Sequence, residues 1–143
     1  MNLLFFPKSH SMGYTISWEP LRFTDFTYAT VLSVVSRVIS CRMRVEHCGF
    51  LIGEDDDSCV AFARDGIQTP WEKTNRMPYT KEAMKALIVM VEYGVTENLD
   101  HDDSDMAWYL EALDAVHAKH PLVSYEQQRQ YFVNLETSKR VMS

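Results

Sequence analysis

The chain has 143 residues, of which 46% are hydrophobic and 24% are charged. This length suits one domain with its own hydrophobic core, and the composition excludes an intrinsically disordered chain, which would lack so many apolar side chains. The formal net charge of −6 argues against nucleic-acid binding, because that affinity depends on basic side chains that contact phosphates.

Residues 1–13 are expected to form an N-terminal extension, and residues 14–143 a single α+β domain. The apolar run Leu3–Phe6 ends at Pro7 and is too short for a signal peptide or a membrane span. No later stretch has the ~18 consecutive apolar residues that a membrane helix needs. Three cysteines without a CxxC pair argue against a disulfide framework or a zinc site, so we expect a cytoplasmic protein.

The first predicted elements are a strand at 14–18 and a helix at about 25–40. Apolar and polar residues alternate in the segment YTISW, as is typical of a strand. The segment that follows has apolar residues at helical spacing, with Thr24 or Thr27 available as the N-cap.

A buried strand is predicted at 43–53 and a second strand at 59–63, joined by the acidic turn EDDDS. These two strands are expected to form a β-hairpin. Residues 67–79, which include two prolines and Trp71, are expected to form a loop.

The second half of the chain is predicted to be mainly helical. Thr80 is a candidate N-cap, and Gly94 a candidate C′ residue, of a helix that is apolar nearly all round and therefore central. A further helix is expected at about 103–119, followed by Pro121. Residues 122–136 suit either a hairpin or one more helix. Together these elements predict an α+β fold in which a small, mainly antiparallel sheet is packed by three to four helices.

The segment LDHDDSD, residues 99–105, places four carboxylates, a hydroxyl and an imidazole within seven residues. It precedes and enters the predicted 103–119 helix, whose first N–H groups and partial positive charge favour short acidic side chains. The segment lacks the glycine of an EF-hand calcium loop. We therefore interpret it as a helix start with a solvated acidic face, and the alternatives are a partner-facing patch and an ion site.

The segment EHCGFLIG, residues 46–53, resembles the strand that opens the JAMM/MPN (Mov34-type) metalloisopeptidase domain, which has the pattern E-x-C-G-x-L-x-G. This resemblance implies that Glu46 takes the position of a general base beside a zinc-bound water. The metal segment of the family has the form HxHP followed by S-x-x-D, but this chain has no HxH, and only Asp105 fits as a ligand. Because two of the three zinc ligands are missing, the hydrolase activity does not carry over. The alternative interpretation of Glu46 is a strand-edge charge paired with Arg42 or Arg44.

The sequence contains no other complete set of catalytic residues. It has neither the glycine patterns that bind phosphates nor a G-x-S-x-G nucleophile elbow. Cys48 follows His47, but adjacent strand residues point to opposite faces, so Cys48 is predicted to be a small core residue. We therefore predict no catalytic residue, no metal and no cofactor, with Glu46 and Asp105 as the candidates under the JAMM/MPN alternative.

The sequence favours a small, soluble, non-enzymatic binding protein, such as an immunity protein, a phage-encoded inhibitor or an adaptor. Nine of its twenty acidic residues lie in 54–57 and 97–105, so we expect two acidic patches that engage a protein with a basic surface. Trp71 is expected to add affinity unless its ring folds back over the core. The alternatives are a divergent or inactive JAMM/MPN-like domain and a small-molecule or nucleotide binder that uses Trp71, Arg76 and Arg64. The predicted partner-binding residues are Asp55, Asp56, Asp57, Trp71, Asp100, Asp102 and Asp103.

Overall fold

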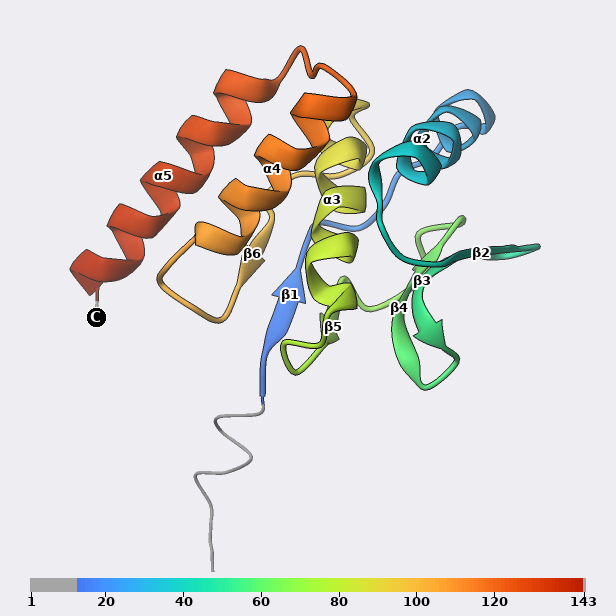
Figure 1. Cartoon of the computed structure of the whole chain (residues 1–143), viewed down its shortest axis with the longest axis horizontal. Helices are drawn as coiled ribbons and strands as arrows, with labels where there is room; N and C mark the ends of the chain where they lie inside the picture. The colour runs from blue at the N-terminus through green and yellow to red at the C-terminus, as the bar shows by residue number, and fades with distance from the viewer. Residues whose placement is uncertain (1–12, 143) are drawn as a thin grey trace, which may run out of the picture.

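The computed structural model describes residues 13–142 and shows an α+β fold of four helices and two three-stranded antiparallel sheets (Figure 1). The predicted fold class is confirmed, with two small sheets in place of one. The predicted N-terminal extension, residues 1–13, lies outside the described residues apart from Gly13. The helices are α2 (Asp25–Val38), α3 (Tyr79–Glu92), α4 (Ala107–Lys119) and α5 (Tyr125–Met142). The strands are β1 (Thr15–Ser17), β2 (Met43–Glu46), β3 (Gly49–Asp55), β4 (Ser58–Ala63), β5 (Trp71–Lys73) and β6 (Asp100–His101).

The first sheet has the order β5–β1–β6. The strand predicted at 14–18 is confirmed as β1, in which Ile16 is fully buried. In β5, Trp71 pairs with Ser17, so part of the segment predicted to be a loop belongs to this sheet. β5 has three residues and β6 has two, and strands this short leave no periodic pattern in the sequence.

The second sheet has the order β2–β3–β4, and two hairpins join its strands. The single strand predicted at 43–53 is wrong, because the chain turns at His47 and Cys48 and returns as β3. Neither of these residues is a typical turn former, so the sequence does not mark the turn. The second hairpin, β3–β4, confirms the prediction for 59–63.

Two predicted helix ends agree with the structure, and so does one of the two alternatives for residues 122–136. Thr24 is the N-cap of α2: its hydroxyl accepts from the N–H of Thr27 at 3.0 Å, and the Thr27 hydroxyl accepts from the N–H of Thr24 at 2.8 Å. Gly94 follows α3 with a φ of 75°, the left-handed conformation that glycine adopts without strain. Residues 122–136, predicted as hairpin or helix, lie mostly in α5.

Two predicted helix starts are wrong. α3 begins at Tyr79, directly after Pro78, and the Thr80 side chain is buried one residue inside the helix instead of capping it. Pro78 already has helical backbone angles, so the helix begins there without a side-chain cap. α4 begins at Ala107 and not near residue 103.

Helix α3 lies at the centre of the fold, where it packs against α2 and α4 and also against β3 and β4 (Figure 1). Its residues Ala86 to Met90 are all fully buried, as its apolar sequence predicts. The two sheets meet at the ring of Trp18, whose centroid lies 5.4 Å from that of Phe62. Buried side chains from both sheets and from all four helices form one hydrophobic core. Among the residues described, no helix combines the length and apolarity that crossing a membrane requires.

Candidate protein-interaction site

The carboxylates of the segment 99–105 bind groups within the protein. Both oxygens of Asp103 accept from the guanidinium of Arg76, at 2.7 and 3.0 Å. Asp102 accepts from the backbone N–H of Thr15 at 2.8 Å. The segment therefore ties the β5–α3 loop and β1 together.

The interpretation of 99–105 as a helix start is correct only for Asp105, which accepts from the N–H of Ala107 at 2.9 Å. Asp102 and Asp103 precede the helix and contact residues that lie 87 and 27 positions away in the chain. Spacing within the segment gives no sign of partners so distant, and neither helix capping nor the alternatives of a partner-facing patch and an ion site predicts these contacts.

Lys139 of α5 binds the same loop from another side. Its ammonium donates to the carbonyl oxygens of His101 and Asp103, the latter at 2.8 Å, and lies 2.5 Å from Oδ1 of Asp100. Lys139 and Arg76 therefore offset the charges of Asp100 and Asp103 within the fold. These predicted partner-binding residues have a structural role that the sequence did not indicate.

His101 is buried in this segment, with 4% of its surface exposed. Its Nε2 lies 3.1 Å from Sδ of Met106, and since a thioether only accepts, Nε2 carries the proton. Nδ1 then accepts from the hydroxyl of Tyr14. Burial, with a smaller contribution from the Lys139 ammonium, lowers the pKa of His101 from 6.5 to about 4. The imidazole is therefore neutral at pH 7 and acts as part of the core.

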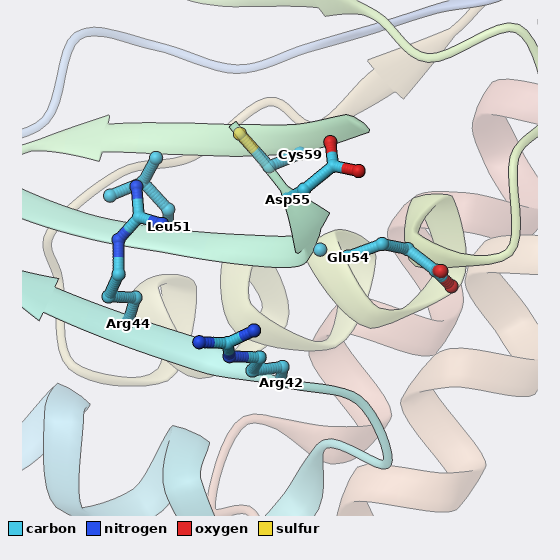
Figure 2. A pocket seen from close by; sticks show the side chains of 7 residues that line it. Arg42, Arg44, Leu51, Glu54, Asp55 and Cys59 are labelled. Atoms are coloured by element: carbon cyan, nitrogen blue, oxygen red, sulfur yellow. The ribbon is translucent and has the colours of Figure 1, made fainter. Parts of the chain in front are cut away.

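The outer face of the β2–β3–β4 sheet is open to solvent at Ala61, in the middle of β4, which is exposed. The inner face presents Phe50 and Phe62, which are buried, and Phe50 packs against Tyr28 of α2. Figure 2 shows the strands from the outer side, with helices behind them. Because side chains alternate along each strand, the outward positions are occupied by Arg44, Glu46, Gly49, Leu51, Gly53, Cys59, Ala61 and Ala63.

A shallow groove of about 380 Å³ lies on this face, toward the β2–β3 turn. Leu51, Ala61 and Ala63 line it, and so does Ile67, whose side chain is 84% exposed. Its wall is therefore largely apolar, and the small residues keep it open. Sequence reasoning missed this surface because each strand alone has only a few small outward residues, which become one surface only when the strands pair.

Two glycines of the EHCGFLIG segment are explained by the close approach of β3 to β4. A Cβ atom on Gly49 would lie 2.1 Å from the carbonyl oxygen of Phe62. A Cβ atom on Gly53 would lie 2.2 Å from the carbonyl oxygen of Ser58. Packing alone thus requires glycine at both positions, whatever the chemistry of the neighbouring Glu46.

The acidic turn at the tip of the β3–β4 hairpin is exposed. Oδ1 of Asp55 accepts from the N–H groups of Asp57 and Ser58, both at 2.9 Å, and so closes the turn. These predicted partner-binding residues lie at the end of the outer face, next to the outward side chains of β3 and β4.

Negative charge predominates over the outer face and its two ends. Arg44 extends across β3 beside Leu51 (Figure 2), and its guanidinium binds Glu46 at 3.0 Å and Asp56 at 2.5 Å. Arg42 lies next to it on the same side of the sheet (Figure 2). With Arg64, which lies beside Asp65 at the end near the β2–β3 turn, three arginines stand against six carboxylates, those of Glu46, Glu54, Asp55, Asp56, Asp57 and Asp65.

The three residues named for the small-molecule alternative, Trp71, Arg64 and Arg76, do not form one site. Trp71 lies on β5 of the first sheet and is 51% exposed, so its ring is not folded fully over the core. Arg64 stacks on the ring of Tyr28, and Arg76 stacks on the ring of Tyr14. The two arginines therefore pack on different parts of the molecule. They do not form the shared site that the small-molecule alternative requires.

Cys48 is exposed in the β2–β3 turn, so the prediction that it is a core residue is wrong. The alternation of a strand does not apply within the turn. Cys41 and Cys59, like Cys48, are unpaired, and burial raises the pKa of the Cys41 thiol to about 11.

The two residues implied by the JAMM/MPN resemblance lie in different parts of the fold. Glu46 ends β2 in the second sheet and pairs with Arg44, whereas Asp105 follows β6 of the first sheet. Within residues 13–142, no three His, Cys, Asp or Glu side chains are grouped so that they could hold a metal ion. Comparisons with known protein families, with curated proteins and with solved structures find no match. The resemblance therefore stays a prediction that rests on residues 46–53 and their surroundings.

Proposed function

We propose that the chain is a non-enzymatic binding domain of the immunity, inhibitor or adaptor type that engages a basic protein partner with the outer face of its β2–β3–β4 sheet. The observation that supports this most directly is the apolar groove on that face, together with the carboxylates at the two ends of the face. Apolar contacts supply affinity at such a surface, and charge steers the encounter. The proposal places the protein in the cytoplasm, which its three unpaired cysteines support.

The chemistry of the face defines what the partner must present. Apolar side chains are needed to cover Leu51 and Ala61. Lysine or arginine is needed at one end for the hairpin tip 54–57, and at the other end for Glu46 and Asp65. The best partner is therefore an apolar segment flanked by basic residues.

A selection of displayed random peptides against the purified protein tests this chemistry. We expect the enriched peptides to combine apolar residues with lysine or arginine. Binding should be lost in the variant Ala61→Lys, which fills the groove with a cation, and kept in the matched variant Ala118→Lys on α4. Enrichment of acidic peptides, or equal binding by both variants, would contradict the proposal.

Neutralising the hairpin tip tests the electrostatic part. In Asp55→Asn/Asp56→Asn/Asp57→Asn, the asparagine at position 55 retains the oxygen that closes the turn. We expect the association rate with a selected peptide to fall several-fold at low ionic strength and to depend less on salt, because steering depends on net charge. Surface biosensor kinetics measure both.

The control for this experiment is the triple variant Asp114→Asn/Glu126→Gln/Glu136→Gln, which removes the same number of charges from α4 and α5. Its association rate should stay near that of the wild type. Equal slowing in the two triple variants would show that net charge alone, and not this face, controls the encounter.

A further inference from the structure

The two edges of the β2–β3–β4 sheet differ in their hydrogen bonding. At the β4 edge, the side-chain amide of Gln68 accepts from the N–H of Ala63 and donates to the carbonyl oxygen of Ala61 at 3.0 Å. Gln68 therefore occupies the positions that a further strand would use. Such blocking is one way in which proteins prevent pairing between sheet edges.

At the other edge, β2 makes extensive contact only with β3 among the described elements, and it lies at the margin of the molecule (Figure 1). The N–H of Gly53 donates to the carbonyl oxygen of Arg42 at 3.2 Å, so this pair is a hydrogen-bonded one. Because hydrogen-bonded and non-hydrogen-bonded pairs alternate in an antiparallel ladder, Arg44 and Glu46 also bond inward to β3. The backbone groups of Met43 and Val45 therefore point outward from this edge.

The side chains of β2 favour one way of pairing this edge with a second copy of itself. When a two-fold axis passes through Val45, Arg44 faces the second copy's Glu46, and this pair occurs twice. An axis through Arg44 or through Glu46 would instead place like charges opposite each other, which is unfavourable. The Val45 register also makes Val45, which is 52% exposed, face its own copy.

We propose that two copies of the chain pair antiparallel through β2, with the two-fold axis at Val45, and form one continuous six-stranded sheet. The guanidinium of Arg44 binds Glu46 and Asp56 of its own chain, and because it has five N–H donors it can keep them while it also binds the second copy's Glu46. The backbone groups of Met43 and Val45 gain the partners that β3 does not provide. This pairing does not depend on the proposed function, because the backbone edge of β2 forms it, and of the residues that line the groove it engages only Glu46.

The test is the mass in solution, measured by sedimentation and by light scattering over a wide range of protein concentration. We expect a mass that rises with concentration toward twice the 16.6 kDa of one chain. A mass of one chain at every concentration would overturn the proposal.

Charge exchange tests the register, and it is done in an Asp56→Asn background so that the other partner of Arg44 does not bias the result. Arg44→Glu alone and Glu46→Arg alone should each abolish dimerisation, because each places like charges opposite one another. The double variant Arg44→Glu/Glu46→Arg should restore it. Dimers in a single variant, or none in the double variant, would overturn the Val45 register. The same exchange in the ion pair of Glu136 and Arg140 of α5 is the control and should leave the mass unchanged.

A proline tests the use of the strand edge. Val45→Pro removes an outward N–H but no bond to β3, so the monomer should fold, as circular dichroism can verify, while the dimer is lost. A folded Val45→Pro protein that still dimerises would place the interface elsewhere and overturn the proposal.

Discussion

The imidazole of His101 is buried between Tyr14 and Met106, and its protonation is therefore linked to folding. The folded chain takes up a proton there only near pH 4, whereas the unfolded chain takes it up near pH 6.5. The unfolded state thus binds more protons between these values, so stability falls as the pH is lowered through this window, by up to ~3 kcal/mol in total. Urea unfolding at pH 7 and at pH 4.5 measures the loss.

The control for this pH dependence is His101→Gln, which has no group that titrates at this position. We expect this variant to be less stable than the wild type at pH 7, since the hydroxyl of Tyr14 loses its acceptor. Its free energy of unfolding should change much less between pH 7 and pH 4.5. The main cause of the low pKa of Asp103 is its hydrogen bond with Arg76, which both proteins keep, so most of its contribution cancels in the comparison. An equal pH dependence in both proteins would assign the effect to other groups.

At the level of single residues, the sequence predicted the acidic character of 99–105 but not the role of its residues. Composition alone shows that the segment is acidic. The burial of His101 depends on Tyr14, which lies 87 positions away, and the pairing of Asp103 depends on Arg76. Contacts this distant are fixed by the fold, so a pattern of neighbours in the chain could not reveal them.

Among the elements, the β3–β4 hairpin depends most visibly on one residue, Gly53. A Cβ atom there would lie 2.2 Å from the carbonyl oxygen of Ser58 and 2.5 Å from Cα of Cys59. We expect Gly53→Ala to lower the free energy of unfolding by more than ~2 kcal/mol, because the two strands must separate. Gly94→Ala is the matched comparison: its Cβ would meet nothing within 4 Å, so only its φ of 75° should cost about 1 kcal/mol. Denaturant unfolding of the two variants compares them, and similar losses would refute the steric argument.

Helices and strands were predicted well where the sequence pattern is long. They were predicted poorly where a strand forms only because it pairs with a neighbouring strand. The helices near 25–40 and 103–119 have several turns of apolar periodicity, and both exist with shifted ends. β5 and β6 have three and two residues, and they are strands only because β1 lies between them. The turn at His47 and Cys48 escaped detection because the residues on both sides of it are strand formers.

At the scale of the molecule, the candidate site follows from how the strands pair. The hairpin tip 54–57 was predicted from its composition and is exposed at one end of the outer face. The groove beside it requires Leu51 of β3 to meet Ala61 of β4, and this register is fixed by the antiparallel pairing of the two strands and not by a linear pattern. The acidic end of the site could therefore be read from the sequence, and the apolar part could not.

The two sheets should unfold together, since one core joins them. Trp18 follows β1 of the first sheet and contacts Phe62 of the second, and Ile16 of β1 belongs to the same buried cluster as Phe50 of β3. Separating the sheets would expose this shared apolar surface, so a state with only one sheet folded should not be populated. We expect tryptophan fluorescence, far-ultraviolet circular dichroism and the thiol reactivity of Cys41 to change at the same urea concentration. Fluorescence reports the surroundings of all three tryptophans, Trp18, Trp71 and Trp108. Circular dichroism reports the helices, and the Cys41 thiol reports the segment that leads into β2. If Cys41 became reactive at a lower urea concentration than the fluorescence change, the second sheet would unfold independently, and the core would be two units instead of one.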